Sequence, residues 1–199
     1  MTRKKAYEKK IVKLIFITEG IYDLEKELII KCPISIHGAG QNKTFIQGVK
    51  GIKIEGPKKE KKRVHMQGMT MKGSSGHGLY NENGLSFLCK DMTFTQCVFH
   101  GVVAWNTKGR LINCVITQCY MGGIICHENA LIELEGSQTK VEGNGTSEGG
   151  SGLFAWGTSS IIHLLYPLTK ESVSTNNHND KNYHSWGIIQ TVESFENLV

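Results

Sequence analysis

The feature that most constrains the fold is a short motif that occurs twice, 22 residues apart. Residues 94–97 (FTQC) are followed by the apolar stretch 101–105 (GVVAW), and residues 116–119 (ITQC) are followed by the stretch 123–127 (GIICH). A period near 20 residues with strand-forming content is typical of a solenoid, in which each repeat is one coil stacked on the next. The sequence therefore predicts a repeat architecture with one continuous core.

A second repeated motif extends this period along the chain. After the turn at 73–76, a glycine followed by two apolar residues occurs five times, with spacings of 23, 22, 29 and 35 residues; the glycines are Gly78, Gly101, Gly123, Gly152 and Gly187. The first two spacings define clean coils. The longer ones predict loops inserted at 142–151 and 174–185, because insertions in a repeat map to loops on its outside.

The first third of the chain consists of short stretches that alternate in polarity and are separated by glycine. We expect strands at 11–17, 21–24, 28–30, 33–36, 44–48, 51–56 and 64–71. Such runs bounded by turn residues are typical of strands, and no stretch has a sustained helical period. The succession 20–22 (GIY), 33–40 (PISIHGAG) and 44–48 (TFIQG) resembles the opening coils of right-handed parallel β-helix proteins of the pectin-lyase-like superfamily. The resemblance spans about residues 15–156.

We therefore predict that residues 1–199 form one all-β domain, a single-stranded right-handed parallel β-helix. A period of 22 residues gives about seven to eight coils. Residues 1–10 are a charged lead and 174–185 an inserted polar loop. The resemblance implies little about activity, because this fold hosts lyases, hydrolases, epimerases, phage tailspikes and non-enzymatic interaction domains.

The groups that polysaccharide-cleaving enzymes use are not evident. Glycoside hydrolysis needs two carboxyls about 5–9.5 Å apart, and the three aspartates, Asp23, Asp91 and Asp180, are far apart in the sequence. Cys126 and His127 are adjacent in a predicted strand, so their side chains should point to opposite faces rather than share a metal. We assign no catalytic residue, no metal site and no cofactor.

The cysteines indicate a reducing compartment. Five of the six lie in apolar strand patterns, where free cysteine is usually buried: Cys89, Cys97, Cys114, Cys119 and Cys126. The alternative is a disulfide between Cys97 and Cys119 on neighbouring coils. No signal peptide is evident, and no apolar run reaches the roughly 18 residues of a membrane span. We expect an intracellular protein, with incorporation into a particle as a further expectation.

Charge is uneven along the chain. Residues 1–63 hold 16 Lys/Arg and 7 Asp/Glu, whereas residues 64–199 hold 7 and 11. The densest basic run is a predicted loop that contains Lys58, Lys59, Lys61, Lys62 and Arg63. It lacks the interleaved aromatic residues that stack on bases, so we interpret it as a solvated loop and do not expect nucleic acid as a partner. Binding of phosphate or nucleic acid by this loop is the alternative.

The glycine register predicts which side chains face outward. The first and third residues after each glycine should point one way and the second and fourth the other. The outward set is apolar or aromatic where a free solenoid should be polar: Tyr80, Val103, Trp105, Ile125, His127, Phe154, Trp156 and Ile189. Two alternatives stay open. An inserted loop or residues 193–199 could cover the stripe, and a slip of one residue would exchange the two faces.

This outward stripe favours a non-catalytic binding or scaffold module, such as a virion or assembly component. Its partner would be another protein or a second copy of the chain, because a large exposed apolar patch marks an interaction site. The alternative is a carbohydrate-active protein, a polysaccharide-binding protein, lyase or hydrolase with an unrecognised site.

Overall fold

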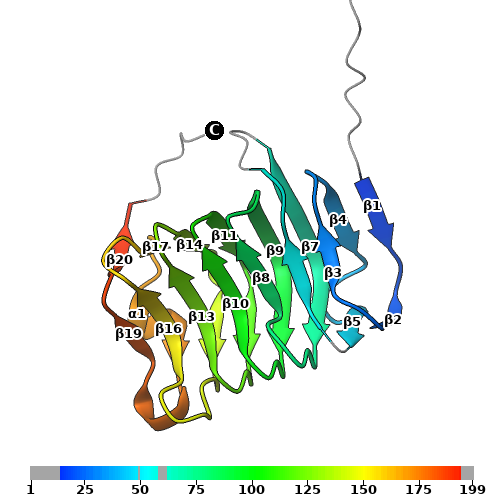
Figure 1. Cartoon of the computed structure of the whole chain (residues 1–199). Helices are drawn as coiled ribbons and strands as arrows, with labels where there is room; N and C mark the ends of the chain where they lie inside the picture. Colours follow the sequence, from blue (N-terminus) through cyan, green and yellow to red (C-terminus); the bar gives the residue numbers. More distant parts are fainter. Residues whose placement is uncertain (1–13, 49, 58–61, 194–199) are drawn as a thin grey trace, which may run out of the picture.

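The structure is a computed structural model that describes residues 14–48, 50–57 and 62–193. The chain forms an all-β parallel solenoid of about 7 turns, each of about 24 residues, with almost no helix. Figure 1 shows the strands stacked along one axis, from β1 in blue to β20 in red. The predicted parallel β-solenoid is therefore confirmed.

Two hydrogen-bonded sheets run along the axis, and every strand pairing within them is parallel. Sheet B contains seven strands: β3 (Leu28–Ile30), β6 (Ile52–Ile54), β8 (Leu79–Glu82), β10 (His100–Trp105), β13 (Gly122–His127), β16 (Ser151–Trp156) and β19 (Tyr183–Ser185).

Sheet A contains thirteen strands in two branches that meet in the long strands β7 and β9. The first branch is β1 (Leu14–Ile17), β4 (Ser35–Gly38), β7 (Arg63–Lys72), β9 (Ser86–Thr95), β11 (Lys108–Ile112), β14 (Leu131–Glu135), β17 (Ile161–Leu165) and β20 (Ile188–Val192). The second adds β2 (Gly20–Leu24), β5 (Thr44–Gly48), β12 (Val115–Thr117), β15 (Lys140–Glu142) and β18 (Ser174–Thr175).

The register of sheet B confirms the first three glycine spacings. Val102 pairs with Leu79 on one side and with Ile124 on the other, and Ile124 pairs with Leu153. The corner between the two branches of sheet A also repeats. Asp91 and Asn113 occupy equivalent positions there with φ of 49° and 51°, a left-handed conformation that Asn and Asp tolerate better than most residues.

The fourth glycine spacing is wrong. Leu153 pairs with Tyr183, 30 residues on, and Gly187 follows β19 and leads into β20 of sheet A. The stretch 174–185 is therefore not only a loop, since it contains β18, a 3-10 turn (His178–Asp180) and β19. Polar side chains hold this coil together where apolar alternation is missing, because the Asn177 amide donates to the Val141 carbonyl at 3.0 Å and accepts from the Asn144 amide at 3.1 Å.

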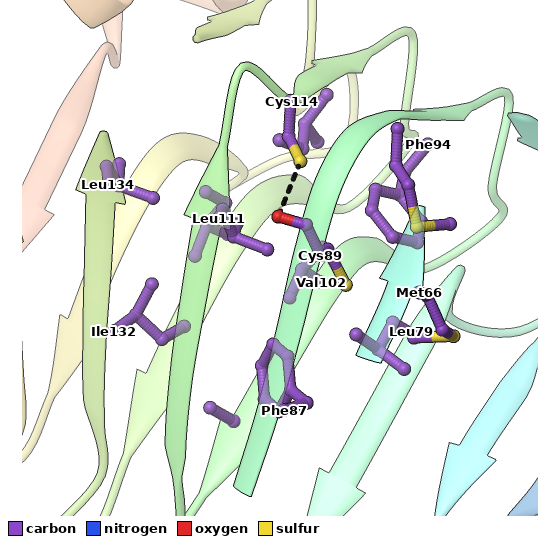
Figure 2. Packing of buried hydrophobic residues seen from close by; sticks show 14 of the residues in the cluster. Met66, Leu79, Phe87, Cys89, Phe94, Val102, Leu111, Cys114, Ile132 and Leu134 are labelled. Atoms are coloured by element: carbon purple, nitrogen blue, oxygen red, sulfur yellow. Dashed lines mark hydrogen bonds between the residues drawn. The ribbon is translucent and has the colours of Figure 1, made fainter. Parts of the chain in front are cut away.

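The core is a column of apolar side chains between the sheets (Figure 2). Met66, Cys89, Leu111 and Leu134 are fully buried and occupy successive coils of sheet A. The five cysteines predicted to be inward are all buried and carry free thiols: Cys89, Cys97, Cys114, Cys119 and Cys126. The dashed line in Figure 2 joins the Cys114 thiol to the Cys89 carbonyl at 3.5 Å.

Helical structure is slight. One helix, α1 (Lys170–Val173), is capped by Thr169, whose side-chain oxygen accepts from the Ser172 backbone N–H at 3.2 Å. Within the described residues there is no helix with the length and apolarity that crossing a membrane requires.

Candidate functional site: the outer face of sheet B

Strand alternation divides the central strands of sheet B into an inner and an outer set of side chains. The inner set is fully or almost fully buried: Val102, Ala104, Ile124, Cys126, Leu153 and Ala155. The outer set forms two columns, because the strands are in register. Tyr80, Val103, Ile125 and Phe154 form the first, and Trp105, His127 and Trp156 form the second.

The structure thus brings together seven of the eight residues of the predicted stripe. Val103 is buried, with 5% of its surface exposed, whereas Trp156 is 40% exposed and the other five are intermediate. Ile189 lies elsewhere, on β20 of sheet A, where it pairs with Ile162 and packs against the core. Ile189 does not join the stripe because the last turn of sheet B is 30 residues long, from Leu153 to Tyr183, and residue 189 therefore falls beyond β19.

The second column is a ladder of stacked rings. The His127 ring lies between the two indoles, with its centroid 4.2 Å from that of Trp105 and 5.5 Å from that of Trp156. Trp186, which follows β19, extends the ladder with its ring 4.9 Å from Trp156. The Trp105 indole N–H donates to the Glu128 carboxylate at 2.9 Å, which fixes the ring's orientation.

Three further rings form an opposite wall at the other ends of the strands. His77 stacks on Tyr80 with centroids 5.3 Å apart and on His100 with centroids 5.5 Å apart, and Phe99 lies 5.2 Å from His77. The Tyr80 hydroxyl donates to the Glu82 carboxylate at 2.7 Å, and burial together with this bond raises the pKa of Tyr80. The glycine register does not assign His77, Phe99 or His100 to the site, although His77 and His100 each directly precede one of the repeated glycines, Gly78 and Gly101.

The two histidines of this wall are neutral at physiological pH. Burial lowers the pKa of His77 to about 4, and burial together with the charge of His77 lowers the pKa of His100 to about 4. The His100 backbone N–H donates to Nδ1 of His77 at 3.3 Å, so the neutral His77 ring carries its proton on Nε2. His77 therefore offers one N–H donor without a net charge.

The walls enclose a groove that we call the sheet-B groove. Its main hollow, of about 580 Å³, is lined by residues that include Tyr80, Phe99, His100, Trp105 and His127, together with Glu27, Lys50 and Lys53. A smaller hollow of about 170 Å³ continues it, lined by Met121, Phe154, Trp156 and the turn 147–151, among others. The hollows share His100 and Ile125, so the groove runs along the solenoid axis.

Two polar atoms on this face lack partners. Nδ1 of His100 and Nδ1 of His127 are buried and make no hydrogen bond among the described residues. The nearest carboxylate to His127, that of Glu128, is 3.9 Å from its Nδ1, which is beyond hydrogen-bonding distance. A buried polar atom without a partner costs free energy, and a ligand would recover part of it if the imidazole rings turned to present these nitrogens to the groove.

The described part of the basic run, Lys62 and Arg63, does not line this groove. Lys58, Lys59 and Lys61 lie outside the described residues. Lys62 is exposed, and Arg63 is exposed at the start of β7 on sheet A. Within the described part of the chain, no group of three or more His, Cys, Asp or Glu side chains is placed to hold a metal ion.

Comparison with known proteins gives no assignment: no family model, no curated protein and no solved structure matches this chain.

Proposed function

We propose that the chain is a non-catalytic binding module that holds a protein partner in the sheet-B groove. The observation that carries the proposal is the apolar character of an outward face. Phe99, Met121, Trp156 and Trp186 keep between 39% and 57% of their surfaces exposed. Aromatic residues and methionine are enriched in protein interfaces, and tryptophan and tyrosine are frequent anchors of binding energy.

The groove also has the polar groups that a specific interface needs. His77 presents a neutral N–H, and the unpartnered Nδ1 atoms of His100 and His127 lie among the aromatic rings. Uncharged groups of this kind suit the backbone amides and carbonyls of a polypeptide segment, which need hydrogen-bond partners when they are buried. Of the described residues that line the main hollow, Glu27 alone is a carboxylate, whereas glycoside hydrolysis uses a pair.

The experiment compares the native chain with the double variant Trp105→Ser/Phe154→Ser. The native chain is used to isolate its partner, and the affinity of the purified partner is then measured by calorimetry. Both substitutions lie on the outer face, so the variant should stay folded, as judged by circular dichroism. Loss of two aromatic anchors should weaken binding by at least about a hundredfold.

Two control variants distinguish this outcome from a general defect. Leu153→Ser changes the neighbouring inward side chain, which is fully buried, and should prevent stable folding. Lys140→Ala changes an exposed residue of β15 and should leave affinity unchanged. Unchanged affinity of the folded double variant would exclude the sheet-B groove as the binding site.

A saccharide chain is the second candidate ligand. The observation that favours it is the ladder of flat rings, Trp105, His127 and Trp156, repeated once per coil along the axis. Such rings can stack on the apolar faces of successive sugars while the histidine nitrogens hydrogen-bond to hydroxyls. Tryptophan fluorescence titrations with neutral and acidic polysaccharides test this candidate, and saturable quenching that Trp156→Ser abolishes would support it over a protein partner.

The remaining parts of the proposal concern ancestry and location. We propose that the solenoid belongs among the pectin-lyase-like β-helices, on the basis of its parallel coils and the sequence stretches 33–40 and 44–48. We also propose a reducing compartment inside a cell or particle, because five cysteines are buried thiols. Determining where the tagged protein localises, and its thiol state there, tests the second point.

A further inference from the structure

A second group of unpartnered histidines lies on sheet A, away from the sheet-B groove. His37 on β4 and His65 on β7 project from the outer face of the sheet, with ring centroids 5.1 Å apart and planes at 74°. Phe16 on β1 packs edge-on against His37 at 5.6 Å. The proposed partner-binding function uses none of these residues.

Both imidazoles have an unsatisfied nitrogen. Nε2 of His37 and Nε2 of His65 are buried and make no hydrogen bond among the described residues. A single buried nitrogen without a partner is seen in many proteins. Here two such nitrogens lie on neighbouring coils, in rings that contact each other, and they form a cluster. Because an imidazole ring can turn about its terminal torsion, a ligand that accepts hydrogen bonds could be reached by both rings.

The charged side chains around the two rings indicate whether an anion or a cation would bind there. Burial lowers the pKa of His65, and the proximity of His37, Arg63 and Lys90 lowers it further. Arg63 precedes His65 by two residues on the same face of β7. Lys90 on β9 is aligned with Gln67 of β7, which is aligned with His37. Neither Arg63 nor Lys90 forms an ion pair with a described residue.

We propose that His37, His65, Arg63 and Lys90 form a binding site for a tetrahedral oxyanion, the chemistry of a phosphate or sulfate ester. Guanidinium, ammonium and imidazole N–H groups are the donors that bind such anions most strongly. The same positive charges disfavour a metal cation, which two histidines alone would otherwise suggest. Arg110 on β11 is already paired with Glu135 at 2.7 Å.

Binding should strengthen as the pH falls. Protonation of His65, whose pKa is lowered by burial, adds positive charge to a site that already faces Arg63 on β7 and Lys90 on β9, while the neighbouring Ser35 and Gln67 do not titrate. Asp91, which directly follows Lys90 on β9, is an acidic neighbour whose charge opposes anion binding, whereas Glu135 on β14 is paired with Arg110. Sulfate is the cleaner probe, because it keeps its charge across this range, whereas inorganic phosphate changes its own.

The test is a titration of the full chain with sodium sulfate, followed by the NMR signals of the histidine rings. Sodium chloride at matched ionic strength is the control, and His37→Gln and His65→Gln assign the signals. We expect saturable shifts of His37 and His65, tighter at pH 5.5 than at pH 7.5, and no response of His77 or His100 in the sheet-B groove. Lys90→Ala should weaken binding about tenfold, and Lys140→Ala should not.

The probes also separate the sources of the anion. Saturation by inorganic phosphate at pH 7.5 that is tighter than by sulfate would indicate phosphate esters, and the reverse order would indicate sulfate esters. Shifts that do not saturate, or that chloride reproduces, would overturn the proposal. Saturable binding of Zn²⁺ by the same rings, with no response to either oxyanion, would replace it with a metal site.

Discussion

At the scale of single residues, the sheet-B groove is defined by the neutral state of its histidines. His77 and His100 stack on each other inside a wall of aromatic rings, and burial keeps the charged form of each unfavourable. Such a wall can accept an apolar partner at neutral pH, but it should resist acid poorly. The stability of the protein should therefore depend on the protonation of these two side chains.

The free energy of unfolding should fall as the pH is lowered from 6.5 toward 4. Histidine has a pKa near 6.5 in an unfolded chain and about 4 at His100 in the folded one, so the unfolded chain binds more protons in this window. Urea midpoints at pH 7 and pH 4.5 measure the loss. His100→Gln should lose less stability than the unchanged protein over this interval, and parallel losses would contradict a neutral, buried His100.

The thiols provide a second test at this scale. Burial raises the pKa of Cys114 and that of Cys126 to about 12, which keeps them as unreactive thiols. A thiol reagent should label the native chain slowly and should find close to the six cysteines of the sequence after unfolding without reductant. Two or fewer free thiols would show that disulfides form, with Cys97 and Cys119 the first pair to examine.

Residue patterns predicted the inner face better than the outer one. The inward positions Val102, Ile124 and Leu153 can be predicted from strand alternation alone, because a shift of one residue would place the outward residues Trp105, His127 and Trp156 in the solenoid core. The wall formed by His77, Phe99 and His100 was not predicted, because Phe99 and His77 lie outside the strands or at their ends, where alternation gives no direction.

At the scale of elements, coils are spaced by glycines that allow close approach. A Cβ atom at Gly123 would lie 2.5 Å from the Gly152 carbonyl and 2.4 Å from Cγ1 of Val141. Neither Gly101 nor Gly123 has a positive φ. A position can require glycine either because its φ is positive or because a side chain would clash with a neighbour. At Gly123 the second reason applies, since a Cβ atom would collide with the next coil.

Gly123→Val should destabilise the protein by more than the roughly 1 kcal/mol typical of point substitutions. The side chain would force β13 away from β16 and disturb the pairing of Ile124 with Leu153. Thermal and urea unfolding measure the effect, with Lys140→Ala as the exposed control. Equal unfolding free energies for the two variants would show that the coils are not in the register described.

The sequence pattern does not predict the strands of the last coil, where polar side chains replace the alternating apolar residues. The central strands were predicted because glycine and alternating residues repeat at 22 and 23 positions. The last coil depends instead on buried amides, with Asn144 donating to the Ile116 carbonyl and Asn177 to the Val141 carbonyl. A sequence pattern of apolar residues does not reveal such bonds, so β18 and β19 were interpreted as a loop.

At the scale of the whole molecule, the solenoid turns a sequence period into an extended surface. Stacking equivalent residues at the coil spacing aligns Trp105, His127 and Trp156 along the axis, so one apolar outward position per coil becomes a continuous ladder. The fold and the direction of this ladder could be predicted from the sequence. The depth of the sheet-B groove could not, because it depends on turns such as 147–150 that lie between the repeating strands.

Intrinsic fluorescence tests the central claim, that this aromatic face is open to solvent and available to a partner. All three tryptophans of the chain, Trp105, Trp156 and Trp186, contribute to the ladder on this face. Acrylamide should quench a large part of the fluorescence of the native full-length protein, although less than in the urea-unfolded chain because Trp105 is half-buried, and Trp156→Phe/Trp186→Phe should remove most of the quenchable signal. Native fluorescence that acrylamide cannot quench until the chain unfolds would show that the ladder is covered, and would contradict the proposed binding face.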